Sequence, residues 1–94
     1  MQHFKLVYRD FPNAAQGQVY GLTQQRQGYC LIWIDSAAPA DRQAAALRHE
    51  LAHIALDHFS DNARSLRQLE AEADSFAERL TAAEFEKLMQ YRIQ

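Results

Sequence analysis

The sequence has one cysteine, no long apolar run and no block of charge of one sign. Cys30 has no partner for an internal disulfide, which is typical of a reducing, cytoplasmic setting. No apolar stretch approaches the ~18 residues of a membrane span, and the N-terminus lacks the basic and apolar regions of a secretory signal. We therefore expect a cytoplasmic protein that does not enter a membrane.

The charges nearly balance, with ten Lys plus Arg against twelve Asp plus Glu and a formal net charge of −2. This balance disfavours nucleic acid as a direct partner, because nucleic-acid-binding domains concentrate basic residues. A chain of 94 residues that is 48% hydrophobic and 23% charged fits one small domain, residues 1–94. Since so short a chain buries a small core, a bound metal ion or a partner can add needed stability.

The apolar pattern changes character at Asp35. Three segments before it contain alternating, aliphatic, or β-branched and aromatic residues, which is typical of β-strands. They span residues 4–9, 19–22 and 29–34. Residues 10–17 contain proline, asparagine and glycine and are expected to form a loop, and residues 24–28 are expected to turn the chain into the third strand.

Three helices are expected after Asp35. They span residues 40–57, 63–80 and 82–91. The buried stripe of the second helix is expected to comprise Leu66, Leu69, Ala73, Phe76 and Leu80. Thr81 and Glu84 have the spacing of a capping box, which starts the third helix. Three strands followed by three helices predict an α+β domain, with a small three-stranded antiparallel or mixed sheet packed on the helices.

The chemistry is concentrated in His49-Glu50-Leu51-Ala52-His53, inside the first expected helix. Residues four apart on a helix lie within ~40° of each other and one turn apart, so His49 and His53 face the same way. Two imidazoles so placed can bind one zinc ion through their Nε2 atoms. Glu50 lies at the edge of the same site, where its carboxylate can take a proton from a water molecule on the metal.

A simpler interpretation is that two partly exposed histidines and a surface glutamate happen to follow one another on a helix. However, Leu47, Leu51 and Ile54 lie on the opposite side of this helix. They supply its core face without the histidines, which leaves the histidine face free for a ligand. The pattern therefore favours a metal site.

Catalytic zinc usually takes three protein ligands, and the second helix offers the third. On a helical wheel Glu70 falls within the apolar stripe, whereas Glu72 points about 200° away, among solvated positions. A carboxylate among buried residues needs a cation or strong donors, because burying it unpaired is costly. Glu70 is therefore the predicted third ligand, and an ion pair with Arg67 or another arginine is the alternative.

Other polar residues leave two interpretations open. Asp74, one turn beyond Glu70, can orient a zinc-bound histidine or remain a solvated charge. His58 is expected to cap the C-terminus of the first helix, with stabilisation of an oxyanion as the alternative. Tyr20 and Tyr29 can donate a phenol to the same oxyanion, although tyrosines on strands more often pack.

The run from His49 to His58, followed by Glu70-Ala71-Glu72-Ala73-Asp74-Ser75-Phe76-Ala77, resembles the ImmA/IrrE-type zinc metallopeptidases. The second motif of that family reads Glu-x-x-Ala-(Asn/Asp)-x-Phe-Ala. The resemblance covers residues 29–80 and implies a minimal zincin with a thermolysin-like site. It implies that Zn2+ is held by His49, His53 and Glu70, that Glu50 is the catalytic base, and that the substrate is a repressor-type transcription factor.

Two functions follow from these residues. The first is a zinc endopeptidase that acts on a protein or peptide, and the second is a noncatalytic, zinc-stabilised module for protein interaction. Glu50 favours the peptidase, because a structural zinc site has no use for a base beside it. Structural sites also normally close with four protein ligands, commonly including cysteines, and the single Cys30 lies on an expected strand.

Overall fold

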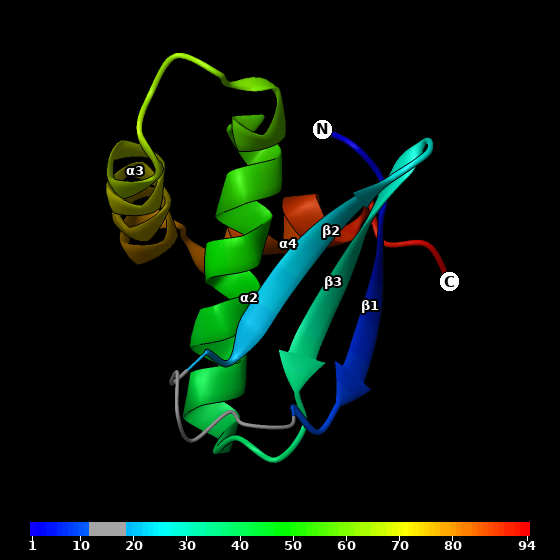
Figure 1. Ribbon diagram of the computed structural model, residues 1–94. Helices are drawn as coiled ribbons and strands as arrows, with labels where there is room; N and C mark the ends of the chain where they lie inside the picture. Colours follow the sequence, from blue (N-terminus) through cyan, green and yellow to red (C-terminus); the bar gives the residue numbers. More distant parts are fainter. Residues whose placement is uncertain (12–18) are drawn as a thin grey trace.

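The computed structural model describes residues 1–11 and 19–94 and has an α+β fold (Figure 1). Its elements are β1 (Phe4–Arg9), β2 (Gly21–Arg26), β3 (Tyr29–Asp35), α2 (Ala40–Ala55), the short 3-10 helix η1 (His58–Ser60), α3 (Leu66–Arg79) and α4 (Ala82–Met89). The predicted fold class is confirmed, and the sheet is the mixed one of the two alternatives. Most of the expected loop over residues 10–17 lies outside the described residues.

The central strand of the sheet is β3, in the order β1-β3-β2. β1 runs parallel to β3, with Phe4 opposite Cys30, and β2 runs antiparallel to it, with Thr23 opposite Ile32. Paired residues face the same side of a sheet, and Ile32 is fully buried. The register of β2 therefore turns Thr23 toward the helices.

The second strand differs from its prediction. It was expected over residues 19–22 with a turn over 24–28, but β2 runs from Gly21 to Arg26 and only Gln27 and Gly28 form the turn. Gly28 has a φ of 85°, in the region that glycine adopts without strain. Ladder pairing with β3 keeps the polar end of β2 extended, in spite of its weak β-propensity.

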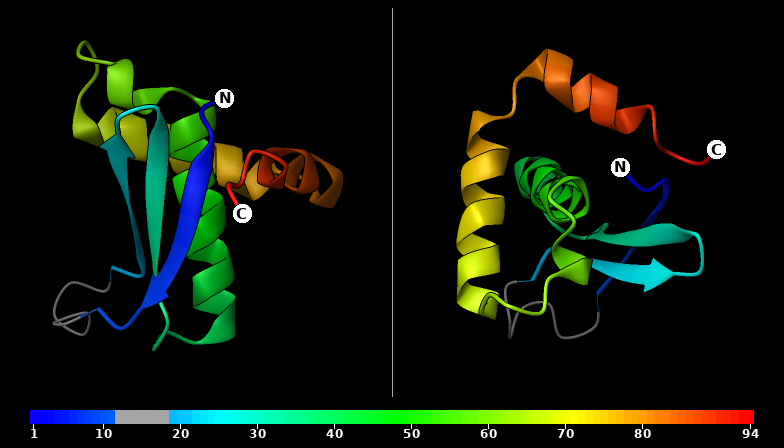
Figure 2. Two further views of the ribbon diagram at one scale, coloured as in Figure 1. Left: turned by 90° about the vertical axis from the view of Figure 1, so that its right-hand side faces the viewer. Right: turned by 90° about the horizontal axis from the view of Figure 1, so that it is seen from above.

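Helix α2 lies between the sheet and α3, and α4 continues around it (Figure 2). The main core joins one face of the sheet to α2, and it comprises Phe4, Cys30, Ile32, Ile34, Leu47, Leu51 and Ile54. The predicted core face of α2 is thus confirmed. None of the helices in the described part of the chain has the length and apolar character needed to cross a membrane.

The ends of helices α2 and α3 differ from their predicted positions. Helix α2 ends at Ala55 rather than near residue 57, because Asp57 takes a left-handed conformation with a φ of 54° and redirects the chain. Helix α3 starts at Leu66, where Ser65 and Gln68 form a capping box. Leu66 was expected in the buried stripe but is 73% exposed, since it lies in the first turn beyond the packed part of the helix.

The third helix begins as predicted. The backbone N–H of Glu84 donates to Thr81 Oγ1 at 3.1 Å, and the backbone N–H of Thr81 donates to Glu84 Oε1 at 3.0 Å. This reciprocal capping satisfies two backbone donors that lack partners within the helix. Beyond α4 the chain returns to β1, where Phe4 N donates to the carbonyl of Tyr91 at 3.1 Å and Ile93 N donates to the carbonyl of Phe4 at 2.7 Å.

Candidate metal centre

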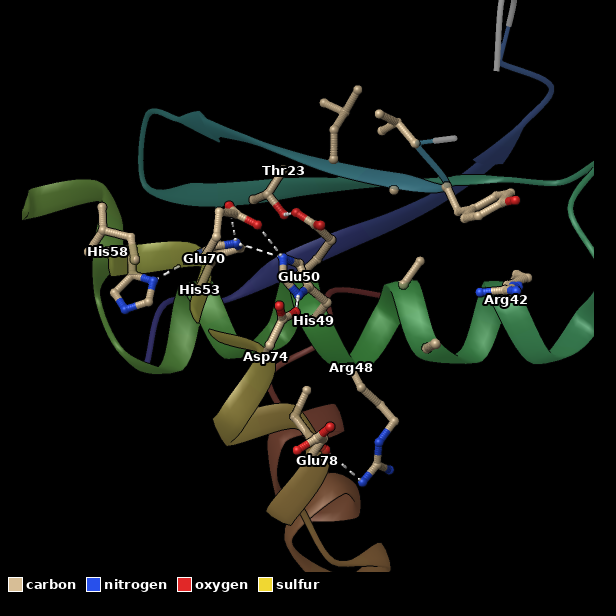
Figure 3. A pocket seen from close by; sticks show the side chains of 18 of the residues that line it. Thr23, Arg42, Arg48, His49, Glu50, His53, His58, Glu70, Asp74 and Glu78 are labelled. Carbon is tan, nitrogen blue, oxygen red and sulfur yellow. Dashed lines mark hydrogen bonds and ion pairs between the residues drawn. The ribbon is translucent and has the colours of Figure 1, made fainter. Parts of the chain in front are cut away.

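Three potential metal ligands from two helices converge at one point (Figure 3). His49 Nε2 and His53 Nε2 lie 3.1 Å apart on α2. The carboxylate of Glu70, on α3, reaches both, with Oε2 at 2.9 Å from His49 Nε2 and Oε1 at 3.0 Å from His53 Nε2. Glu70 is half exposed rather than buried. Among the described residues its ion-pair contacts are with the two histidines, and it pairs with neither Arg67 nor another arginine.

The hydrogen bond between His49 and Asp74 determines which nitrogen of the His49 ring carries the proton and which carries the lone pair. His49 Nδ1 lies 2.8 Å from Asp74 Oδ1, and an ionised carboxylate can only accept, so Nδ1 carries the proton. In the neutral ring the lone pair is then on Nε2, aimed at the Glu70 carboxylate. Two electron-rich groups at 2.9 Å need a proton or a metal cation between them.

The spacing of these atoms suits a small tetrahedral cation. Ligands ~2.1 Å from a tetrahedral zinc ion lie roughly 3.4 Å from one another. The three separations of 2.9, 3.0 and 3.1 Å are a few tenths of an ångström shorter than this. Imidazole nitrogen and carboxylate oxygen are also the donors that catalytic zinc sites use. The residues present therefore fit a zinc ion with three protein ligands.

Glu50 lies beside this group and points toward the sheet (Figure 3). It is only 8% exposed, and the Thr23 hydroxyl of β2 donates to Glu50 Oε1 at 2.8 Å. Burial raises the pKa of Glu50, and the hydrogen bond from Thr23 opposes that rise. Gly21 lets the strand approach, because a Cβ there would lie 3.1 Å from Ala46 Cβ and 3.4 Å from Glu50 Cγ.

His58 does not cap α2 as predicted. The left-handed turn at Asp57 carries it back under the site, where it is 5% exposed and its Nδ1 lies 2.9 Å from His53 Nδ1. Its Nε2 lies 3.1 Å from Glu72 Oε1. Glu72, expected to be solvated, is thus a contact of His58. Burial lowers the pKa of His53, since it penalises the charged ring.

Arg48, on α2, forms hydrogen bonds to the C-terminal end of α3. Its Nη2 donates to the carbonyl oxygen of Ala77 at 3.3 Å and also to that of Leu80. Terminal helix carbonyls lack intrahelical partners and carry partial negative charge, so a guanidinium suits them. The same guanidinium lies 5.6 Å from the ring centroid of Phe85, on α4. Helix α3 is therefore fixed in the position that brings its glutamate to the two histidines.

A cleft of about 1010 Å³ opens over this group, between the β2 end of the sheet and helices α2 and α3. Of the candidates for stabilising an oxyanion, Tyr20 lines the cleft, whereas Tyr29 does not. His58 also lines it, but both of its ring nitrogens have protein contacts. The cleft is large enough to take several residues of an extended peptide beside the predicted ligands.

Comparison with known protein families supports this arrangement. A family model described as the IrrE N-terminal-like domain, a peptidase family, matches residues 2–92. The chain belongs to this family. The match extends well beyond the residues that carry the sequence resemblance, and it supports a metallopeptidase. Searches of curated proteins and of solved structures gave no significant match.

The residues of the IrrE-like motifs were predictable from the sequence, but the residues that hold them in position were not. Thr23, Gly21 and Arg48 were not identified, because their roles depend on strand register and helix packing. A weak signal existed for Thr23, which is a polar residue placed two positions after a glycine in an otherwise extended segment. Such a signal becomes specific only once the pairing of β2 with β3 is known.

Proposed function

We propose that this IrrE-like domain is a zinc-dependent endopeptidase that hydrolyses a peptide bond in a protein, with a repressor-type regulator as the class of substrate. The observation that carries the proposal is the meeting of His49, His53 and Glu70 beside a buried Glu50 at a peptide-sized cleft. Membership of a peptidase family supports the reaction class.

In this proposal the three ligands hold the ion and leave one side open to the cleft. Zinc supplies a Lewis acid that polarises the scissile carbonyl and acidifies a water molecule. Asp74 fixes the His49 ring with Nε2 turned to the ion, through its contact with Nδ1 at 2.8 Å. The half-exposed Glu70 carboxylate completes the set from the second helix.

Glu50 has the position of the general base. Its carboxylate is next to the ligands without being one of them, and its raised pKa brings it closer to the value that proton transfer near neutral pH requires. The Thr23 hydroxyl occupies Oε1 and leaves Oε2 free to accept a proton from water. Glu50 then passes that proton to the leaving amine as the peptide bond breaks.

The test is the variant Glu50→Gln, which keeps the shape of the side chain and removes the base. We expect the variant to bind one zinc ion per chain and to lose all measurable cleavage, while the exposed Glu86→Gln control retains both properties. Zinc content is measured by elemental analysis, and cleavage by mass spectrometry of candidate repressors.

The noncatalytic interaction module is the competing outcome of the same experiment. It predicts that the unsubstituted protein binds zinc but cleaves none of the candidates, and that Glu50→Gln binds partners as the unsubstituted protein does. Cleavage that survives Glu50→Gln would refute the assigned base. Loss of zinc from Glu50→Gln would instead make Glu50 a ligand or a structural anchor.

A further inference from the structure

A chain of four side chains leads from Arg64, just before α3, to the second predicted ligand, His53. Arg64 Nη1 donates to Glu72 Oε2, and Glu72 Oε1 lies 3.1 Å from His58 Nε2. His58 Nδ1 in turn lies 2.9 Å from His53 Nδ1. The far nitrogen of His53 is the one that faces His49 and Glu70.

The direction of the hydrogen bonds follows from the carboxylate end. Glu72 accepts from the Arg64 guanidinium through Oε2, so its carboxylate is paired with a cation and acts as the acceptor toward His58 as well. His58 Nε2 must carry the proton that it donates to Glu72, so in the neutral ring Nδ1 holds a lone pair. His53 Nδ1 is then the donor to His58, and the lone pair of His53 is left on Nε2.

We propose that His58 is a positioning residue for the metal, which accepts the Nδ1 proton of His53, is itself fixed by Glu72 and Arg64, and so holds His53 Nε2 ready to bind the ion. This inference rests on the proposed zinc site and adds to it a second support, independent of the Asp74 contact on His49. The two ligand histidines are therefore oriented by different partners, one by a carboxylate and one by a buried imidazole.

Burial distinguishes this arrangement from a surface network. His58 is 5% exposed and His53 is 8% exposed, so neither ring can replace the contact by water without opening the structure. Among the described residues, no buried side-chain nitrogen or oxygen lacks a hydrogen-bond partner. Removal of the His58 ring nitrogens would leave the Nδ1–H of His53 unpaired, or let the ring take its other tautomer.

The experiment compares zinc affinity in three variants by competition with a chelator. His58→Phe keeps an aromatic ring without hydrogen bonds, His58→Gln retains one acceptor and one donor, and Glu72→Ala removes the half-exposed carboxylate with little risk to folding. We expect His58→Phe to weaken zinc binding about 10- to 100-fold, Glu72→Ala to weaken it less, and His58→Gln to recover most of the loss. The exposed Glu86→Ala serves as the control.

The tautomer gives a readout that a purely structural role would not change. In the zinc-free protein, histidine 1H–15N correlation spectra are expected to show a proton on Nδ1 of His53, and Glu72→Ala is expected to reduce the population that carries it. Unchanged zinc affinity and an unchanged His53 tautomer in Glu72→Ala, with wild-type affinity in His58→Phe, would overturn the inference. Failure of the unsubstituted protein to bind zinc would instead refute the proposed function.

Discussion

The hydroxyl of Thr23 on β2 donates a 2.8 Å hydrogen bond to Oε1 of Glu50 on α2. This contact joins the edge strand of the sheet to the proposed base, across the boundary between the two layers (Figure 3). It is the only side-chain hydrogen bond to Glu50 among the described residues. A carboxylate that is 8% exposed thus depends on one strand residue for its orientation.

Thr23→Val should lower the cleavage rate about tenfold and leave zinc binding unchanged. Valine has nearly the same shape but cannot donate, and a hydrogen bond to a charged group contributes about 1.5–3 kcal/mol. Thr23→Ser, which keeps the hydroxyl, should stay within a few-fold of the unsubstituted rate. Steady-state kinetics with zinc-loaded protein measure both. A Thr23→Val protein as fast as Thr23→Ser would show that the contact does not position the base.

Glu70→Ala should weaken zinc binding more than Glu72→Ala does. Loss of Glu70 removes a ligand and leaves two histidines, so a fall of more than about 100-fold is expected, beyond the usual range of outer contacts. Glu72 reaches the site only through His58, so its loss should cost about tenfold or less. Calorimetric titration with zinc ranks the two. The reverse order would exchange the assigned roles of these glutamates.

Zinc should raise the melting temperature, and a chelator should reverse the rise. Free zinc at ~100 times its Kd stabilises the folded state by about 2.7 kcal/mol. For a domain of this size that corresponds to a shift of roughly 10–20 °C. Differential scanning calorimetry with zinc, with chelator, and with magnesium as the control measures it. His49→Ala should melt at the same temperature with and without zinc, and a zinc-dependent shift in that variant would place the ion elsewhere.

The turn between α2 and α3 should contribute a pH-dependent part of stability. Hydrogen bonds from the backbone N–H and then the guanidinium of Arg64 lower the pKa of Asp61 from 3.8 to about 2. Because the folded-state pKa is depressed, the contribution is present above about pH 4 and is lost as the pH falls through about 2. Asp61→Asn should therefore be less stable than the unsubstituted protein at pH 5, and the difference should be much smaller at pH 2.

Denaturant unfolding of the zinc-free proteins at both pH values checks this prediction. The difference between Asp61→Asn and the unsubstituted protein cancels the titration of groups that both share. Carboxyl 13C titration gives the pKa directly, and Arg64→Gln should raise it toward 3.8. A titration midpoint of Asp61 near 3.8 in the unsubstituted protein would contradict these hydrogen bonds.

The parts of the site that were predictable from sequence are those fixed by a single helix. The i, i+4 spacing of His49 and His53 determines their common face whatever the helix packs against. The capping box at Thr81 is equally local. The approach of Glu70 to the two histidines was predictable in part. Its side of the helix was inferred from an apolar stripe that included Leu66, but Leu66 is exposed and lies outside the buried part of that stripe.

The missed parts depend on geometry that no local pattern contains. Asp57 has a left-handed backbone conformation, and this conformation brings His58 to His53 instead of leaving it at the C-terminus of the helix. Aspartate tolerates that conformation but does not require it, so the residue type alone predicts nothing. Likewise, Thr23 meets Glu50 only because the register of β2 on β3 turns it inward. Both features are set by long-range packing.

The proposed metal group and its network lie within one short stretch, from His49 to Asp74. The hydrogen bond of Thr23 to Glu50 lies outside this stretch, because Thr23 belongs to the hairpin of β2 and β3, where it pairs with Ile32. Separate parts of a fold can open locally while the rest stays closed. A molecule in which β2 has moved away from α2 would therefore keep its metal ligands together while its base has lost its anchor, and it would hold zinc without being able to cut.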